Sequence, residues 1–404
     1  MEFIEKRAKE LYESSSGLSK PADQFGYGFP FLSYSDVFHN YYVPKELSTL
    51  VNSNEKDRAK CSVMRGDVFL TRTSETTDEL GLSCVALRDY PDAVFNGFAK
   101  RLRPITDEIV PEYAAYFFRS SFFRAQCMSM ASLITRASLN DRMISRFRIR
   151  FTKSKADQTA MGEMLMYYDN LIEVNNKRIK VLEQMAENLY KEWFVRFRFP
   201  GYENEEFENG IPKGWKYCTV ESFSVVLQRG ISPNYDDEGD LTVISQKCIR
   251  QNIMDIKEAR RQTKAFKPEL NLLDGDTVIC STGTGTLGRI GQVYGNYPNT
   301  TFDSHVTLVR AKAPIGKHFL YWTLKEMQPW FMNMGIGSTN QQELYRSTIK
   351  NAKALKPRDE IIDHFEKIVE PIHTRIVLLI NNQENLIKQR DYLLPRLMSG
   401  KLEV

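Results

Sequence analysis

Hydrophobic residues recur at alternating steps of three and four along residues 158–194, a stretch with no proline and a single glycine, Gly162. This spacing is typical of a coiled-coil seam, with the charged residues between seam positions facing solvent. A helix of roughly 35 residues would span about 50 Å, and so narrow an apolar stripe needs a partner helix to cover it. The seam positions are Met161, Leu165, Tyr168, Ile172, Asn175, Ile179, Leu182, Ala186, Leu189 and Trp193.

The same spacing returns 204 residues further along the chain, where eight of the ten corresponding positions are apolar. Two seams in one register predict an internal duplication whose two helices pack against each other, and two unrelated core helices are the alternative. Pro371 predicts a kink in the second helix, or a long straight portion of that helix that starts there. The positions are Phe365, Val369, Ile372, Ile376, Leu379, Gln383, Leu386, Arg390, Leu393 and Leu397.

The repetition extends beyond the helices, with an offset that drifts between about 204 and 213 residues, as a diverged duplication would give. Short alternating segments in each half predict strands, residues 111–123 predict an aromatic helix, and residues 2–13 predict a short amphipathic helix. Residues 17–21 correspond to 230–233, residues 66–70 to 275–280, residues 95–98 to 302–305, and residues 138–140 to 338–340.

These patterns predict an α+β protein with two similar α/β globular domains and two long antiparallel helices that form a coiled coil, related by a pseudo-twofold axis. Pro200 and Gly201 end the first helix and begin a linker. The predicted parts are a first globular domain at 1–154, a central long helix at 155–197, a linker at 198–210, a second globular domain at 211–356, and a C-terminal long helix and tail at 357–404.

Net charge is only +4 over 404 residues, but basic residues gather locally. Residues 100–153 hold eleven Lys or Arg against four Asp or Glu, and residues 247–267 hold seven against two. This segregation fits basic faces that meet a polyanion, with ordinary solvated surface as an equal alternative. Six scattered cysteines without a CxxC pair, no signal peptide and no long apolar run predict reduced, mostly buried thiols in a cytoplasmic protein.

Residues 283–288 match the pattern GxGxxG, but the alternating residues that follow predict a second strand where a dinucleotide site needs a helix. A hairpin with a small-residue tip is favoured, in which backbone N–H groups and hydroxyls can approach a phosphate or a base edge. The chain has no phosphate-binding loop, no adenine-methylating segment, no nucleophile elbow and no metal-ligand spacing of histidines. We therefore expect no catalytic residues and no metal site in this chain.

Asn140 and Asn340–Gln341 fall at matching places after small-residue loops, where an amide could bond adenine and Arg136 or Arg289 could read guanine. Turn capping by asparagine and surface polarity of glutamine are the alternatives for each residue.

The order of domain, helix, domain and helix resembles the DNA specificity subunit of type I restriction–modification systems over nearly the whole chain. The resemblance rests on PKGW at 212–215, GDTVICSTGTGTLGRIGQV at 275–293, NNKRIKVLEQMAENLYKEWF at 175–194 and, above all, NNQENLIKQRDYLLPRLMSGKL at 381–402. The first half departs from it, because it lacks a PKGW-like opening and its segment TRTSETTDELGLSCV has no glycine-rich tip. The first hairpin is therefore expected to be longer than the second.

The resemblance implies that each globular domain is a target recognition domain for one half of a split DNA sequence. The helix pair would then set the unread spacer between the halves. It also implies two adenine-N6 methyltransferase subunits that bring S-adenosylmethionine, and restriction motor-nuclease subunits that bring ATP and Mg, with no cofactor in this chain. A non-catalytic coiled-coil adaptor or scaffold that binds protein partners is the competing class, and a stand-alone enzyme is the third.

The residues assigned to DNA contact are Ser16, Gly17, Lys20, Arg72, Thr73, Arg136, Asn140, Lys247, Ser281, Thr282, Gly283, Thr284, Arg289, His305, Asn340 and Gln341. Those assigned to helix pairing and partner docking are Leu165, Ile172, Asn175, Ile179, Leu182, Leu189, Trp193, Ile376, Leu379, Leu386, Leu393 and Leu397. Asn175 is the polar member of the first seam, where a buried amide costs stability but excludes slipped pairings.

Overall fold

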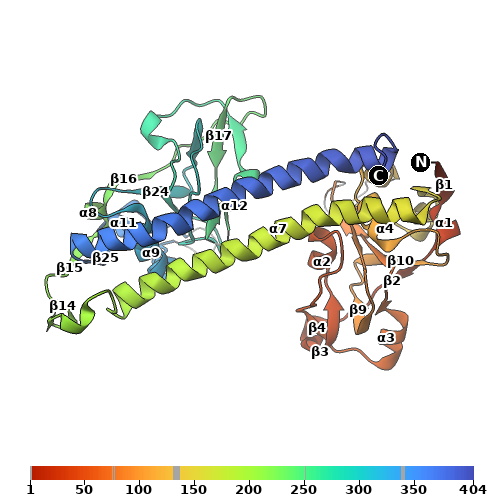
Figure 1. Cartoon of the computed structure of the whole chain (residues 1–404), viewed down its shortest axis with the longest axis horizontal. Coiled ribbons are helices and arrows are strands. Elements are labelled where there is room, and N and C mark those ends of the chain that lie inside the picture. Colours follow the sequence, from red (N-terminus) through yellow and green to blue (C-terminus); the bar gives the residue numbers. More distant parts are fainter. Residues whose placement is uncertain (1, 75, 77, 131–136, 251, 338–341) are drawn as a thin grey trace. The chain divides into compact units, whose positions relative to one another are not determined.

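The computed structural model describes residues 2–404 apart from residues 75, 77, 131–136, 251 and 338–341 (Figure 1). The chain divides into two compact units. Unit 1 comprises Met1–Val174 and Gln383–Val404, and unit 2 comprises Asn175–Asn382. Each unit therefore contains one globular part and a section of both long helices. Among the described residues, no helix combines the length and the apolar character that crossing a membrane requires.

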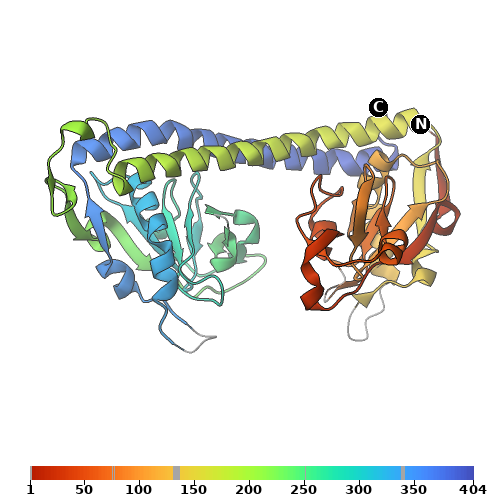
Figure 2. The ribbon, with the colours of Figure 1, turned by 90° about the horizontal axis from the view of Figure 1, so that it is seen from below.

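Both long helices are present. α7 comprises Lys155–Tyr190 and continues as a π-helical turn, Lys191–Val195, while α12 comprises Asp359–Ser399. In each unit the two helices lie side by side (Figures 1 and 2). They run antiparallel, because Trp193 packs on Phe365 near one end of unit 2 while Asn175 contacts Asn382 near the other. The α+β class and the antiparallel helix pair are therefore confirmed.

Every seam position predicted from the sequence is buried or half-buried within its unit. α12 passes through the exposed Pro371 without interruption. A proline removes one backbone hydrogen bond of the helix, but the buried Val369 and the half-buried Ile372 on either side pack against the core of unit 2 and hold α12 in place. Gly162 of α7 lies against the backbone of Glu112, where a Cβ atom would come within 2.7 Å of the carbonyl carbon.

Unit 1 contains a four-stranded antiparallel sheet in the order β2-β10-β6-β8, a second sheet in the order β4-β3-β9-β5, and the pairs β1–β12 and β7–β11. Its strands are β1 Phe3–Arg7, β2 Tyr12–Ser16, β3 Phe25–Leu32, β4 Leu50–Val51, β5 Ser62–Val63, β6 Val68–Thr71, β7 Thr73–Ser74, β8 Ser83–Val85, β9 Tyr90–Phe95, β10 Ala99–Pro104, β11 Ala137–Ser138 and β12 Arg148–Thr152. Its shorter helices are α1 Ala8–Leu11, α2 Tyr34–His39, α3 Glu55–Lys60, α4 Pro111–Phe117, α5 Ser121–Met130 and α6 Asp141–Ile144.

Unit 2 contains a six-stranded sheet in the order β16-β24-β21-β22-β19-β18, a three-stranded sheet in the order β20-β17-β23, and the pairs β13–β14 and β15–β25. Its strands are β13 Phe207–Glu208, β14 Ile211–Pro212, β15 Lys216–Thr219, β16 Ser224–Arg229, β17 Leu241–Ile244, β18 Ile249–Arg250, β19 Ile253–Met254, β20 Arg260–Gln262, β21 Thr277–Cys280, β22 Ile290–Gln292, β23 Thr300–Phe302, β24 Val306–Ala311 and β25 Lys353–Lys356. Its shorter helices are α8 Val220–Phe223, α9 Lys317–Glu326, α10 Gln328–Asn333 and α11 Arg346–Asn351.

The strand orders of the two units match. The sheet β2-β10-β6-β8 corresponds to β16-β24-β21-β22, and the parallel pair β3–β9 corresponds to β17–β23. An internal ion pair is repeated as well, because Arg103 of β10 bonds Asp67 before β6, and Arg310 of β24 bonds Asp276 before β21. The repetition read from the sequence therefore extends to strand order and to buried polar contacts.

The prediction of an amphipathic helix over residues 2–13 is wrong. This segment forms β1, the single turn α1 and the start of β2. β1 pairs antiparallel with β12 from Phe3↔Thr152 to Arg7↔Arg148, a partner distant in sequence that no local pattern contains. The aromatic segment predicted to be helical at 111–123 forms two helices, because α4 ends at Phe117 and α5 begins at Ser121, and α4 contributes Tyr113 and Tyr116 to the core. All six cysteines are free, and all but one are buried, as predicted.

Candidate nucleic-acid interface

Four segments of unit 2 meet beside the start of β24. They are the end of β16, the loop 281–289, the turn 303–305 and the segment 342–344. The loop joins β21 to β22, which pair antiparallel, so the predicted hairpin is confirmed. In unit 1 the corresponding loop between β6 and β8 covers residues 72–82, and it is longer, as expected.

Hydroxyl groups of the unit 2 hairpin point in different directions. Ser281 is buried, and its Oγ lies 2.6 Å from Oγ1 of Thr307. Thr282 lies half-buried, with Oγ1 2.6 Å from Nδ1 of the exposed His305, while Thr284 is exposed at the tip beside Gly283. The structure thus brings Thr282, Gly283, Thr284 and His305 to one surface and leaves Ser281 as an internal support.

The guanidinium of Arg289 supports the hairpin tip from behind. Its two terminal nitrogens donate to the carbonyls of Ile249 and Gly285, each at 3.0 Å. Lys247 is exposed on a neighbouring turn. A small surface pocket at the tip is lined by Gly283, Thr284, Gly285, Leu287, Met332 and Gln342.

The predicted contact residues of unit 1 gather at the equivalent end of its sheet. Ser16 ends β2, and Gly17 passes so close to the turn after β9 that a Cβ atom would lie 2.3 Å from the carbonyl oxygen of Asn96. Lys20 forms an ion pair of 2.9 Å with Asp57, which lowers the pKa of that carboxyl. Both this glycine and its counterpart Gly230 allow the two backbones to touch.

Arg72 and Thr73 follow β6 in unit 1. The backbone N–H of Arg72 donates to the carbonyl of Phe98 at 2.9 Å, and its own carbonyl accepts from Leu139 at 2.9 Å. Its Nε is buried and has no hydrogen-bond partner among the described atoms. Thr73 pairs with Ser138 through the short strands β7 and β11.

The same hydrogen bonds recur in unit 2. The N–H of Ser281 donates to the carbonyl of His305 at 2.8 Å, and its carbonyl accepts from Leu344 at 2.8 Å. Ser281 and His305 therefore stand where unit 1 has Arg72 and Phe98. The two loop clusters are built by one backbone pattern that presents different side chains.

Asn140 acts as a helix cap. It precedes α6, and its Oδ1 accepts from the N–H of Met143 at 2.9 Å, which is the capping role named as the alternative to base reading. Three other predicted contact residues, Arg136, Asn340 and Gln341, lie outside the described residues.

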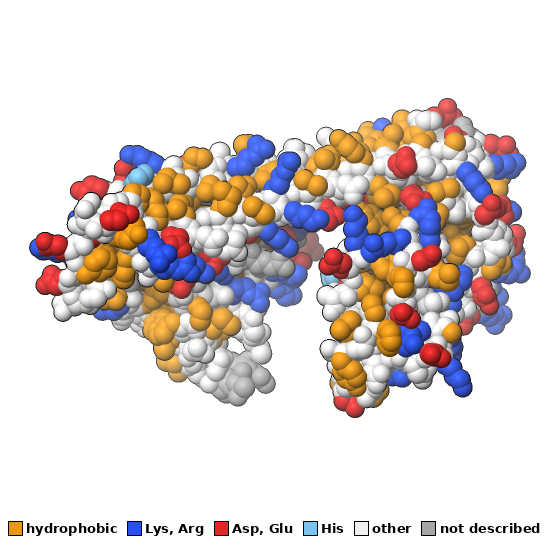
Figure 3. All heavy atoms as spheres, turned by 60° about the horizontal axis from the view of Figure 1, so that its bottom comes forward, with side chains coloured by type: hydrophobic (Ala, Val, Ile, Leu, Met, Phe, Trp, Pro, Cys, Tyr) orange, Lys and Arg blue, Asp and Glu red, His pale blue; other side chains and the backbone are white. Residues whose placement is uncertain are grey.

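Many of the basic residues between 100 and 153 form hydrogen bonds or ion pairs within unit 1. Lys100 bonds Asp141, Arg103 bonds Asp67, and Arg119 donates to four backbone carbonyls. Figure 3 shows one face on which Lys and Arg side chains are interspersed with Asp and Glu. The excess of basic residues over 100–153 therefore overstates the basic surface of unit 1.

The predicted pairing residues divide between the two units. In unit 1, Leu165 packs on the core with Leu397 and Leu393, and the carbonyl of Ile172 accepts from Gln383 at 3.2 Å. Leu386 is half-buried. In unit 2, Ile179, Leu182, Ile376 and Leu379 form a cluster around Tyr294, while Leu189 and Trp193 join the main core. Asn175 donates to Oδ1 of Asn382 at 2.9 Å, a partner for the buried amide that the sequence did not reveal.

A polar cluster that fixes the helix pair in unit 1 was missed. Arg390 of α12 forms a buried ion pair with Asp169 of α7, and Asp169 also accepts from the hydroxyl of Tyr116 at 2.6 Å. The ring of Tyr41 lies 5.0 Å from the guanidinium carbon of Arg390. The polar residue at seam position 390 was the available signal, because a charge on an apolar seam requires a buried partner.

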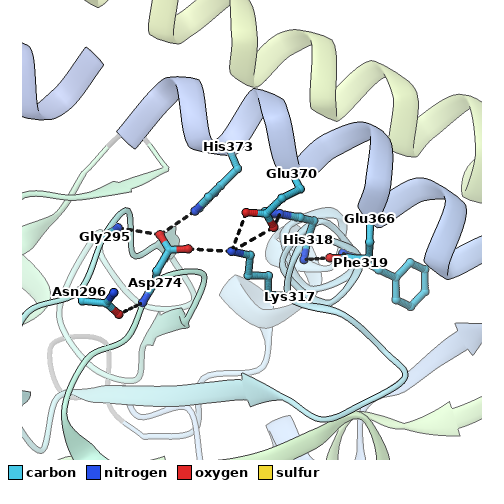
Figure 4. A network of polar contacts seen from close by, with 9 residues as sticks. All are labelled: Asp274, Gly295, Asn296, Lys317, His318, Phe319, Glu366, Glu370 and His373. Atoms are coloured by element: carbon cyan, nitrogen blue, oxygen red, sulfur yellow. Dashed lines mark hydrogen bonds and ion pairs between the residues drawn. The ribbon is translucent and has the colours of Figure 1, made fainter. Parts of the chain in front are cut away.

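Unit 2 uses a different network at its helix pair (Figure 4). Asp274 accepts from Nε2 of His373 at 2.7 Å and from Nζ of Lys317 at 2.7 Å. Burial lowers the pKa of His318 to about 4, so its ring is neutral and its Nε2 donates to Glu370 at 3.0 Å. Together these contacts attach the loop before β21 and the start of α9 to α12.

Asp274→Asn is expected to lower the free energy of unfolding by about 2–4 kcal/mol near pH 7, because it removes the charge of a half-buried carboxylate that accepts from three donors. Burial raises the pKa of Asp274, but hydrogen bonds from His373, Lys317 and the N–H of Gly295 lower it well below its usual range. A lowered carboxyl pKa stabilises the fold fully above the unfolded pKa of about 4, and this stability is lost as pH falls through the folded pKa. Urea denaturation at about pH 7 and about pH 3 should therefore give a difference in stability between the two proteins that is smaller at pH 3. The exposed Asp363→Asn serves as the control and should leave stability nearly unchanged.

Comparison with known proteins finds a family model that matches the first half of the chain and relatives that align with nearly all of it. Residues 2–184 match the family model of the type I restriction modification DNA specificity domain. The chain is similar to the type I restriction enzyme MjaIX specificity subunit of Methanocaldococcus jannaschii, at 25% identity over 99% of this chain and 93% of that subunit. It is also similar to the HindI specificity subunit of Haemophilus influenzae, at 21% identity over 92% of this chain and 94% of that subunit.

A solved structure has the same fold. The S subunit of a type I restriction–modification system from M. genitalium aligns with a TM-score of 0.58 at 13% identity, covering 98% of this chain and 96% of that one. At this identity the likeness concerns the fold alone.

Proposed function

We infer that this chain, which belongs to the DNA specificity subunits of type I restriction–modification systems, gives its system the ability to recognise a DNA sequence. The match of residues 2–184 to the DNA specificity domain supports this role, as do the relatives that align along both halves. Its part in the system is recognition, while other subunits of the complex carry out methylation and cleavage.

Each unit reads one half of a two-part DNA target. The observation that carries this proposal is the repeated loop cluster, in which Arg72 and Phe98 of unit 1 make the backbone contacts that Ser281 and His305 make in unit 2. One backbone pattern with different exposed side chains suits two readers of different sequences. Loops carried by a rigid sheet can vary their side chains without loss of the fold.

The helix pair links the two readers and sets the number of unread base pairs between their half-sites. α7 and α12 each contribute one section to unit 1 and another to unit 2, and each is continuous across the boundary. The internal repetition would present two equivalent docking surfaces, which suits two adenine-N6 methyltransferase subunits carrying S-adenosylmethionine. Restriction motor-nuclease subunits with ATP and Mg would complete the complex.

Replacing residues 211–356 with the corresponding domain of another specificity subunit is expected to change one half-site and leave the other intact. The exchange is structurally mild, because β15 and β25 pair antiparallel near the two ends of the segment and bring both junctions together. The full complex is produced in a host that lacks adenine methylation, and single-molecule sequencing maps the methylated adenines. A change in both half-sites would contradict the assignment of one reader to each unit. Absence of any sequence-specific methylation by the unaltered complex would instead favour the adaptor alternative.

A further inference from the structure

Phe98 is an exposed aromatic ring in the loop cluster of unit 1. Its side chain is 61% exposed, although most phenylalanines of this unit lie in the core. A single exposed apolar residue is common on protein surfaces, so exposure alone carries no conclusion. Phe98 differs from other exposed apolar residues because it lies in a turn that recurs in unit 2.

The turn that carries Phe98 has the same internal bonds as the turn that carries His305. The N–H of Phe98 donates to Oδ1 of Asn96 at 2.6 Å, and the N–H of His305 donates to Oδ1 of Asp303 at 2.9 Å. The next residue in each case, Ala99 or Val306, donates to the carbonyl of the same Asn or Asp. Each ring therefore stands on a turn that is fixed by side-chain and backbone hydrogen bonds.

The neighbours of Phe98 resemble those of a DNA-contact surface. The backbone of Arg72 bonds the carbonyl of Phe98, and Thr73 follows it in the chain. Lys20 lies on the adjoining loop, which meets the Phe98 turn through a bridge between Leu18 and Asn96. The turn of Phe98 is thus joined through its backbone to segments that carry Arg72, Thr73 and Lys20, residue types that can contact phosphates.

We propose that Phe98 reads a base in the half-site of unit 1, through contact of its ring with the C5-methyl group of a thymine. This inference rests on the proposed function. A phenyl ring has neither donor nor acceptor, so the thymine methyl is the feature of a major-groove base edge that it can recognise. In unit 2 the equivalent His305 has Nδ1 occupied by Thr282, which leaves Nε2 for a hydrogen bond to a base. The same turn position therefore reads an apolar group in one half-site and a polar group in the other.

The first test compares methylation patterns of the full complex carrying wild-type chain, Phe98→Ala or Phe98→His. Phe98→Ala should relax the preference for thymine at one position of the unit 1 half-site and leave the other half-site unchanged. Ile105→Ala is the matched control, because Ile105 is 57% exposed and lies just beyond the opposite end of β10. It should leave the pattern as it is in the wild type.

The second test measures binding of the complex to target duplexes in which each thymine of that half-site is replaced in turn by deoxyuridine, which lacks the methyl group. Wild-type affinity should fall roughly 5- to 30-fold at one thymine, and Phe98→Ala should no longer respond to that replacement. Equal affinity for all duplexes, a uniform loss at every sequence, or a loss confined to assembly with the partner subunits would overturn the proposal. If exchange of 211–356 still changes one half-site, such a result removes Phe98 alone and leaves the proposed function standing.

Discussion

Inserting four residues into each long helix, after Asn175 and after Asn382, is expected to add one base pair to the unread spacer while both half-sites are kept. Four residues lengthen an α-helix by about 6 Å and turn it about 40° beyond a full turn. One more base pair of B-DNA adds about 3.4 Å and about 35°, so the insertion matches one added base pair in rotation and exceeds it in length by about 3 Å. Lengthening both helices at the level of the Asn175–Asn382 hydrogen bond keeps the antiparallel seam paired, with a local unwinding of the kind that four-residue insertions produce.

The methylation pattern of the complex measures the result directly. The complex with the lengthened helices should bind targets with the original spacer at least about 100-fold more weakly than the wild-type complex does. Only one half-site of such a target can be engaged at a time. The control insertion is placed between Asn209 and Gly210, at the exposed turn of the β13–β14 hairpin, and should leave the spacer unchanged. An altered half-site with the original spacer would show that the helices do not set the distance.

Features with a local period were predictable from the sequence. The seams of α7 and α12, the repetition between the halves and the β21–β22 hairpin all follow from spacing along the chain, and the structure has each of them. The seam residues share one face of each helix, and the spacing along the chain is sufficient to identify that face.

Features that depend on distant partners were not predictable. The local pattern of β1 favours a helix, because the partner strand β12 that makes it a strand lies far away in sequence. Asn140 caps α6, and its place in the sequence fits a helix cap and a base contact equally well. Phe98 was passed over because it carries no polar group, although it already corresponded to His305 in the repeat.

Arg390→Met is expected to lower the free energy of unfolding of the full chain by about 3–5 kcal/mol, because it leaves the carboxylate of Asp169 buried without its counter-charge. The side chains of Arg390 and Asp169 are 14% and 11% exposed, which limits solvent screening. Burial lowers the pKa of Arg390, but Tyr41 and Asp169 raise it above its ordinary value, so the guanidinium stays charged. Burial and Asp169 raise the pKa of Tyr116, which therefore remains a hydrogen-bond donor to Asp169.

The double variant Asp169→Asn, Arg390→Met separates a charge effect from lost packing. Asparagine can still accept the hydrogen bond from Tyr116, and it carries no charge. The free energy of unfolding of the double variant should therefore lie within about 1 kcal/mol of the wild-type value. Lys367→Met, which breaks an exposed pair with Asp363 on the same helix, is the control and should cost less than about 0.5 kcal/mol. In Arg390→Met, amide hydrogen exchange should become faster in the sections of α7 and α12 that belong to unit 1. A double variant as unstable as Arg390→Met would mean that the arginine stabilises unit 1 by packing against Tyr41, and the ion pair would lose its assigned role.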